Sequence, residues 1–206
     1  MKKLLCVFLL LLSPVMAQAW YSSSGWYNSG GIGRAVYDYE TFYIEEGIDG
    51  ASAPAVLSTI TSTHTVFIRD FDDAADEDVD FIWQAPNDIK ADSTISYRVG
   101  FFITNATAPS AEGVAFQLAG ASIGTGDALG ATLGTAIATT AAARSDAQYD
   151  LVYTSWSAAV TITNLAAGET AIMTLNRDVS DAADDYAQDV GVYCLQIKYS
   201  RSLDGV

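Results

Sequence analysis

The sequence predicts an all-β protein, an antiparallel two-sheet sandwich of the jelly-roll type. From Val36 onward, apolar and polar residues alternate with a period of two in many short runs, as they do in half-buried strands. The connections between these runs are rich in Gly, Pro, Asn, Asp and Ser, which form turns. No run has a convincing helical period, which argues against a fold that alternates strands and helices. We expect residues 36–206 to form a single sandwich domain.

The first 19 residues have the pattern of a secretory signal peptide. Lys2 and Lys3 give a positive start, an apolar run extends over residues 4–12, and AQA (17–19) is a small-x-small cleavage site. The apolar run is shorter than the roughly 20 residues that cross a bilayer. We therefore expect cleavage after Ala19, and a secreted mature chain that has no attachment to a membrane.

Residues 20–35 are expected to form a flexible arm. They contain WYSSSG followed by WYNSGG, and Gly and Ser dominate without apolar periodicity. Aromatic side chains are enriched at protein interfaces and also at ordinary domain edges. The arm therefore either docks on a neighbouring subunit or another surface, or packs back on its own domain. The candidate docking residues are Trp20, Tyr21, Trp26 and Tyr27.

Nine runs in the domain are predicted strands: 36–44, 64–71, 79–84, 95–105, 113–120, 149–156, 159–165, 170–177 and 191–200. The clearest is ISYRVGFFITN (95–105), in which Phe102 alone breaks the alternation. Residues 124–148 are rich in Ala, Thr and Gly and have little bulk to bury. We expect them to form a long loop that holds at most a small edge strand or helix.

The charge of the chain restricts its partners. It has 10 Lys and Arg residues against 25 Asp and Glu residues, a net charge of −15. Loss of the leader would remove two lysines and no acid, which gives −17. Such a chain repels phosphate backbones and anionic lipid, so we expect no nucleic-acid partner and no membrane surface. Cations, neutral glycans and basic protein surfaces remain open.

Few residues suit catalysis. Cys194 is the only cysteine after the leader and excludes an internal disulfide, and His64 is the only histidine, which leaves no zinc site of the usual composition. No G-x-S-x-G sequence supports a hydrolytic triad. Glycoside hydrolysis needs only two carboxylates, and Asp80 lies between apolar neighbours, but alternation places it on the polar face. We expect no enzyme.

Two acidic segments could hold calcium, because this ion binds oxygen ligands in loops. They are DFDDAADEDVD (70–80) and DVSDAADD (178–185). An EF-hand is excluded because Phe81 occupies the position where that loop needs Gly. The alternative is a solvated loop without an ion. The candidate calcium ligands are Asp72, Asp73, Asp76 and Asp78.

Four segments together resemble a jelly-roll module found in virion proteins of tailed bacteriophages, in head, neck or tail-associated positions. They are RDF (69–71), VDFIWQAP (79–86), ISYRVGFFITN (95–105) and residues 168–200, where a strand ending in Arg-Asp is followed by an acidic crossover and a last strand. The resemblance implies a sandwich with a structural role and no catalytic residues. It also implies that Arg177 is an internal partner for one or more of Asp178, Asp184 and Asp189.

These observations give three functional hypotheses. The leading one is a non-enzymatic secreted protein of assembly or attachment, part of an extracellular or virion-like structure, whose contacts are made by the arm and one sheet edge. Its oligomers should be lost when residues 20–33 are deleted. The alternative is a carbohydrate-binding module, with calcium as a candidate ligand, in which Trp83 or Trp156 stacks on sugars unless these rings belong to the core. The third is a glycoside hydrolase.

Overall fold

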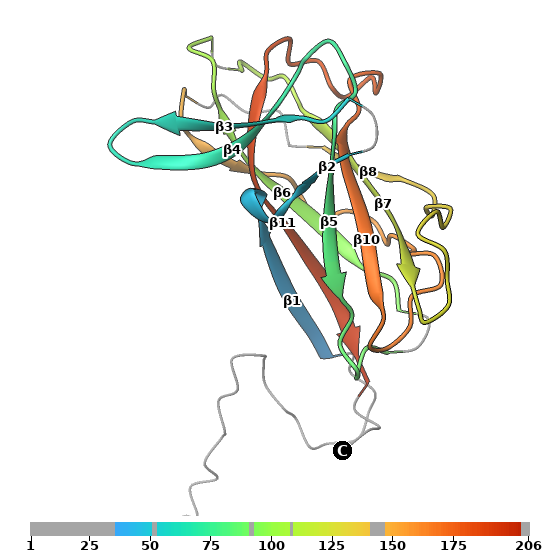
Figure 1. The fold of residues 1–206 in the computed structure, drawn as a ribbon. Helices are drawn as coiled ribbons and strands as arrows, with labels where there is room; N and C mark the ends of the chain where they lie inside the picture. Colours follow the sequence, from blue (N-terminus) through green and yellow to red (C-terminus); the bar gives the residue numbers. More distant parts are fainter. Residues whose placement is uncertain (1–35, 51–52, 91–92, 108, 141–146, 203–206) are drawn as a thin grey trace, which may run out of the picture.

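The protein is an all-β sandwich of two antiparallel sheets, which confirms the predicted fold class. The computed structural model describes residues 36–50, 53–90, 93–107, 109–140 and 147–202. Figure 1 shows the two layers, with β11 at the centre of one and β10 at the centre of the other. The only helix among the described residues is a single 3-10 turn, η1 (Ile44–Glu46).

The first sheet has six strands in the order β3-β4-β11-β6-β9, with β1 paired to β11 beside this row. Its strands are β1 (Val36–Tyr43), β3 (Val56–Thr61), β4 (Thr65–Phe71), β6 (Ser96–Ile103), β9 (Leu151–Tyr153) and β11 (Val190–Arg201). We call it the six-stranded sheet.

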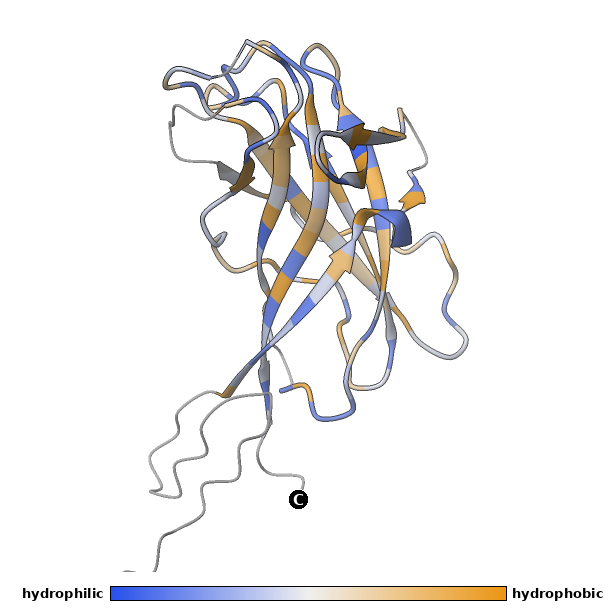
Figure 2. Cartoon of the chain, turned by 90° about the vertical axis from the view of Figure 1, so that its left-hand side faces the viewer, coloured by the Kyte–Doolittle hydropathy of each residue, from blue (hydrophilic) through white to orange (hydrophobic). Residues whose placement is uncertain are grey.

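The second sheet has five strands in the order β2-β5-β10-β7-β8. Its strands are β2 (Ile48–Asp49), β5 (Asp78–Gln84), β7 (Ala115–Ile123), β8 (Ile137–Thr140) and β10 (Thr170–Arg177). Along β10 every second residue is buried, so its apolar residues enter the core while the residues between them face outward. The same alternation appears along the strands in Figure 2, where hydrophobic and hydrophilic positions follow one another.

The core lies between the two sheets and is dominated by aromatic rings. Phe71, Phe101 and Phe116 are fully buried, and the ring of Phe116 contacts that of Phe71 edge-on and that of Phe101 in a tilted pair. Tyr97 is also buried, and its hydroxyl donates to the carbonyls of Phe116 and Ile137 at 2.8 and 2.6 Å. Burying one such ring stabilises the fold by about 1.5–3 kcal/mol, and a one-residue slip in register would expose all the rings of a strand at once.

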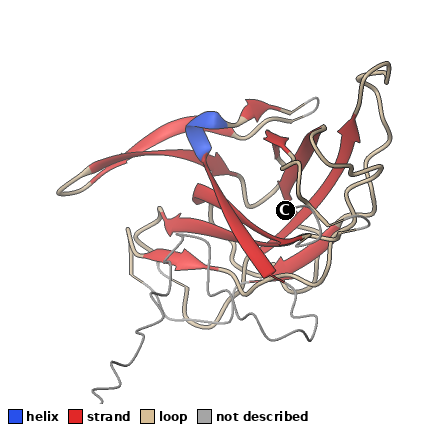
Figure 3. Cartoon of the chain, turned by 90° about the horizontal axis from the view of Figure 1, so that it is seen from below, coloured by secondary structure: helices blue, strands red, loops and turns tan. Residues whose placement is uncertain are grey.

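Strand β11 has two different neighbours, β4 and β1, along one edge, and a β-bulge in its pairing with β6 along the other. Residues 190–192 pair with β4, the register shifts between Val192 and Cys194, and residues 194–201 pair with β1. A bulge bends a strand and ends local pairing. β4 pairs with β11 only through residues 69–71, and the rest of β4 forms with β3 a hairpin that projects from the sandwich, which is visible in Figures 1 and 3.

The structure differs from the predicted strands in two places. Strands β2 and β3 were not predicted. The run 159–165 makes only isolated bridges, at Val160 and Thr163, and Asn164 interrupts it with a φ of 58°. The alanine- and threonine-rich segment 124–148 contains the short edge strand β8, in agreement with the expected loop that holds a small edge strand. Among the described residues, no helix is long and apolar enough to cross a membrane.

Candidate functional site

The four aromatic residues of the predicted arm, and the predicted leader, lie outside the described residues. The arm ends where β1 begins, at Val36. The structure shows where the other predicted residues lie. It also shows two surfaces that were not predicted from the sequence.

Arg177 ties the crossover between β10 and β11 to the sandwich. Its side chain is fully buried and makes a two-point interaction with the carboxylate of Asp184, with nitrogen–oxygen distances of 2.8 and 3.0 Å. Its remaining donors reach four backbone carbonyls, those of Phe71, Asp72, Tyr186 and Gln188. A planar guanidinium suits this fork of acceptors. Arg177 and Asp184 therefore form a structural pair.

The other two aspartates proposed for Arg177 have different partners. Asp178 accepts a hydrogen bond from the Ser180 hydroxyl at 2.7 Å. Asp189 accepts one from the backbone N–H of Asp73 at 3.2 Å. Among the described residues, the ion pair of Arg177 is with Asp184. The crossover thus contributes one internal ion pair, while its other acids organise the loop backbone.

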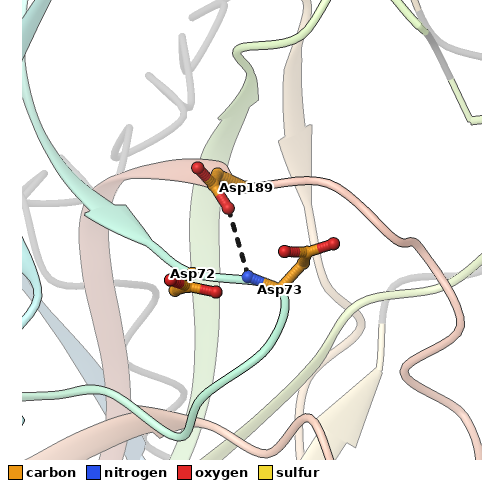
Figure 4. A group of neighbouring side chains, drawn as sticks. All are labelled: Asp72, Asp73 and Asp189. Atoms are coloured by element: carbon orange, nitrogen blue, oxygen red, sulfur yellow. Dashed lines mark hydrogen bonds between the residues drawn. The ribbon is translucent and has the colours of Figure 1, made fainter.

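An acidic cluster forms where β4 ends and β11 begins. Asp72, Asp73 and Asp189 each place a carboxylate oxygen within 4.8 Å of the others (Figure 4). Burial raises the pKa of Asp70, and the charges of Asp189 and Asp72 add to this rise. Burial likewise raises the pKa of Glu77, although the backbone N–H of Asp72 donates to it. The negative charges of Asp72 and Asp189 thus act on the two neighbouring carboxyl groups, Asp70 and Glu77.

The predicted calcium ligands do not all meet at this cluster. Asp72 and Asp73 belong to it, but Asp76 accepts a hydrogen bond from the backbone N–H of Val179. Asp78 is the first residue of β5, and burial raises its pKa. The structure brings Asp189 to the group instead. Three carboxylates at this spacing fit a hard cation, and they also fit a solvated loop, so calcium stays a prediction.

The projecting hairpin presents an uncharged sheet edge. Residues 51–68 contain no Asp, Glu, Lys or Arg, although the whole chain has 35 such residues. Strand β3 pairs with β4 through six residues and has no partner on its other side among the described strands. Val56, Leu57 and Phe67 are 65, 47 and 50% exposed. Large apolar side chains thus surround a free row of backbone donors and acceptors.

The other terminal strands of the two sheets are protected in ways that β3 is not. β2, β8 and β9 have two, four and three residues, which is too short to template a partner. β1 is longer, but it carries Asp38 and Glu40. Charged side chains and short lengths are the usual protection against edge-to-edge pairing. The edge of β3 is therefore the one best suited to pair with another chain.

A second surface covers the outer face of the six-stranded sheet around β1, β6 and β11. Its aromatic members are Tyr37, Tyr39, Tyr43, Phe102, Tyr153, Trp156 and Tyr193. We call this surface, with Arg98 and Lys198 between its rings, the aromatic face. Ring centroids are 5.8 Å apart for Tyr39 and Trp156 and 5.5 Å for Tyr43 and Tyr193.

The two basic residues of the aromatic face contact rings. The guanidinium carbon of Arg98 lies 4.8 Å from the centroid of Tyr153 and 4.9 Å from that of Trp156. The Lys198 ammonium lies 5.2 Å from the centroid of Trp156 and 5.3 Å from that of Tyr37. Burial and the neighbouring Cys194 thiol raise the pKa of Tyr153 to about 12, so its phenol is neutral at physiological pH. Both cations therefore lie over electron-rich ring faces.

The structure separates the two tryptophans proposed as sugar-stacking residues. Trp83 points into the core, is 3% exposed and packs against Tyr199. Trp156 is partly exposed on the aromatic face. This face was not predictable from the sequence because its members come from four segments. The alternation of tyrosines at positions 37, 39 and 43 was its only local signal.

Comparison with known proteins adds no assignment: no family model matches the chain, and no curated protein matches its sequence.

Proposed function

We propose that this protein is a non-enzymatic, secreted structural protein that assembles with copies of itself into an extracellular or virion-like structure. The observation that carries the proposal is the uncharged, unpaired edge of β3 on a projecting hairpin. An antiparallel edge can pair with the same edge of a second copy about a twofold axis, which makes the contact self-complementary. Pairing would join two six-stranded sheets into one.

The net charge of the chain also favours the β3 edge as the contact between copies. Two copies with a net charge of −15 repel each other, and the repulsion is least where neither surface carries a charge. The exposed side chains of Val56, Leu57 and Phe67 would lose water on pairing. At about 25 cal/mol per Å² of apolar area, their burial favours association. The resemblance to phage virion modules and the predicted arm belong to this proposal, with the arm as a second contact.

The test measures the oligomeric state of the mature chain, residues 20–206, by light scattering after gel filtration and by negative-stain microscopy. Val56→Lys places a charge on the β3 edge. Ile82→Lys is the matched control, because Ile82 is also half-exposed (53%) but lies in the other sheet, on β5, which stands between β2 and β10. A third variant lacks residues 20–33.

We expect concentration-dependent oligomers of the wild type and of Ile82→Lys, and at least a tenfold weaker association of Val56→Lys, or about 1.4 kcal/mol. Lysine lowers the net negative charge, so general repulsion would not explain such a loss. A wild-type monomer at all concentrations would refute the proposal. If Val56→Lys and Ile82→Lys associated equally, the β3 edge would not be the site of assembly. Loss of the oligomers in the variant without residues 20–33 would then assign the contact to the arm.

Carbohydrate binding is a second candidate function, and the aromatic face favours it. Sugar rings present flat apolar faces that stack on aromatic side chains, while their hydroxyls need polar partners beside the rings. Gln196 supplies such a group, since it accepts a hydrogen bond from Arg98 at 2.7 Å and donates to Thr41 at 3.2 Å. Binding of sugars that is lost in Trp156→Ala would support this function. Unchanged binding in that variant would exclude the aromatic face as the sugar-binding site.

A further inference from the structure

Apart from the exposed Lys90, the basic residues of the described chain fall into two groups. Arg69, Arg177 and Arg201 each form ion pairs with aspartates. Arg98 and Lys198 have no carboxylate partner among the described residues and are held by aromatic rings instead. In a chain with 25 acids against 10 basic residues, two adjacent cations without a carboxylate are unexpected.

Both cations keep free hydrogen-bonding capacity. Arg98 uses Nε to donate to Gln196, while its two terminal amino groups donate to no acceptor in the described part of the chain. Lys198 has three ammonium donors and contacts only rings there. Contact with a ring face stabilises a cation by about 0.5–1 kcal/mol at an exposed site without neutralising its charge. The rings therefore fix the position of both charges and leave their outer sides open to an anion.

We propose that the aromatic face binds an acidic polysaccharide, a chain whose sugar rings carry carboxylate or sulfate groups. This inference rests on the carbohydrate-binding candidate function and adds the class of ligand. The rings of Tyr39 and Trp156 stack on sugar faces, and Arg98 and Lys198, which both contact the indole, bind the acid groups of the sugars. A guanidinium that is fixed against a ring is suited to bind a carboxylate through two hydrogen bonds.

The net negative charge of the chain does not prevent this binding. The Debye length is about 8 Å at physiological ionic strength, so acids beyond that distance are largely screened, whereas cations in direct contact with the ligand are not. The acidic cluster begins at Asp189, nine residues before Lys198 along β11. At about 3.3 Å per residue this is about 30 Å away. Calcium at that cluster would therefore not contribute to the face.

A single-stranded nucleic acid also combines rings with anionic groups, but it fits the face less well. Proteins that bind such strands track the backbone with a continuous positive groove. Here two cations are present on the face, and the whole chain is strongly acidic. An acidic sugar chain needs only local cations beside the stacked rings.

The test uses isothermal titration of the mature chain, residues 20–206, with a galacturonate hexasaccharide. Its methyl ester has the same rings without the charge, and a heparin-derived hexasaccharide carries sulfate in addition to carboxylate. Arg98→Gln and Lys198→Gln remove the cations, and Trp156→Ala removes the central ring. Lys90→Gln is the control for net charge, because Lys90 is exposed and has no ion pair among the described residues. Circular dichroism checks that each variant is folded.

We expect the free galacturonate to bind at least about tenfold more tightly than its ester, and each of the three face variants to lose about tenfold in affinity, while Lys90→Gln is unchanged. Preference for the heparin fragment would assign sulfate as the recognised group, and chelation of calcium should change nothing. Equal binding of acid and ester would overturn the acidic ligand but leave carbohydrate binding intact. Binding of neither would overturn both. Tighter binding of a thymidine oligonucleotide than of either acidic sugar would also overturn the inference.

Discussion

Arg177 is the residue on which the β10–β11 crossover depends most. It and Asp184 are both nearly inaccessible, with side-chain exposures of 0 and 3%. Removing one partner of a buried ion pair leaves an uncompensated charge in the interior and costs about 3–5 kcal/mol. We expect Arg177→Met to lower the free energy of unfolding by that amount, measured by chemical denaturation.

Arg201→Met is the control for Arg177→Met. Arg201 is also paired with aspartates, Asp38 and Asp88, but its side chain is 30% exposed. Exposed ion pairs contribute about 0–1 kcal/mol, so this variant should lose little stability. Similar losses in the two variants would show that Arg177 does not anchor the crossover.

Asp70 gives a second prediction at this scale, on the pH dependence of stability. One of its carboxylate oxygens is buried without a hydrogen-bond partner among the described residues, and burial with the nearby charges of Asp189 and Asp72 raises its pKa. A raised pKa means that the folded state binds a proton more readily than the unfolded state. Between the unfolded pKa and the raised folded pKa, Asp70 therefore adds stability as the pH falls.

We expect Asp70→Asn to be more stable than the wild type at pH 7, by about 1 kcal/mol or less, and the difference to shrink as the pH falls toward 3.8, the ordinary pKa of an aspartate. The measurement is the thermal midpoint of both proteins across this pH range. Glu40→Gln removes an exposed carboxylate on β1 and should show neither effect. A difference for Asp70→Asn that grows as the pH falls would contradict the sign of the prediction.

At the scale of single elements, strands with strict alternation were predictable and strands at the margins were not. β6 and β10 lie inside their sheets, and burial of every second residue appears directly in their sequences. β3 was missed because both faces of the projecting hairpin meet solvent, so burial imposes no alternation on it. Its two-sided exposure makes β3 hard to predict and also makes it the candidate for assembly.

The crossover between β10 and β11 was likewise predictable from the sequence only in part. An arginine at the end of a strand followed by five aspartates indicates an internal ion pair, and the structure brings Arg177 and Asp184 together. The sequence does not say which aspartate is the partner, because the choice depends on how the loop folds over the end of the sandwich. The aromatic face could not be predicted for a similar reason. It requires the pairing of β1, β6 and β9 around β11, with Trp156 brought in by the loop after β9.

At the scale of the whole molecule, the two proposed contacts should respond to salt in opposite ways. Copies of a chain with a net charge of −15 repel each other, and salt screens that repulsion. The β3 edge carries no charge, so its own attraction is largely insensitive to salt. Binding of an acidic sugar to Arg98 and Lys198 is an attraction between opposite charges, which salt weakens.

Raising the NaCl concentration from about 0.05 to 0.5 M shortens the Debye length about threefold. We expect this change to strengthen self-association and to weaken binding of galacturonate, measured by light scattering and by titration on the same protein sample. The Lys198→Gln variant should keep the first response and lose most of the second. If salt instead dissociated the oligomers, the result would show that contacts between charged groups hold the copies together. The arm or the acidic loops would then replace the β3 edge as the site of assembly.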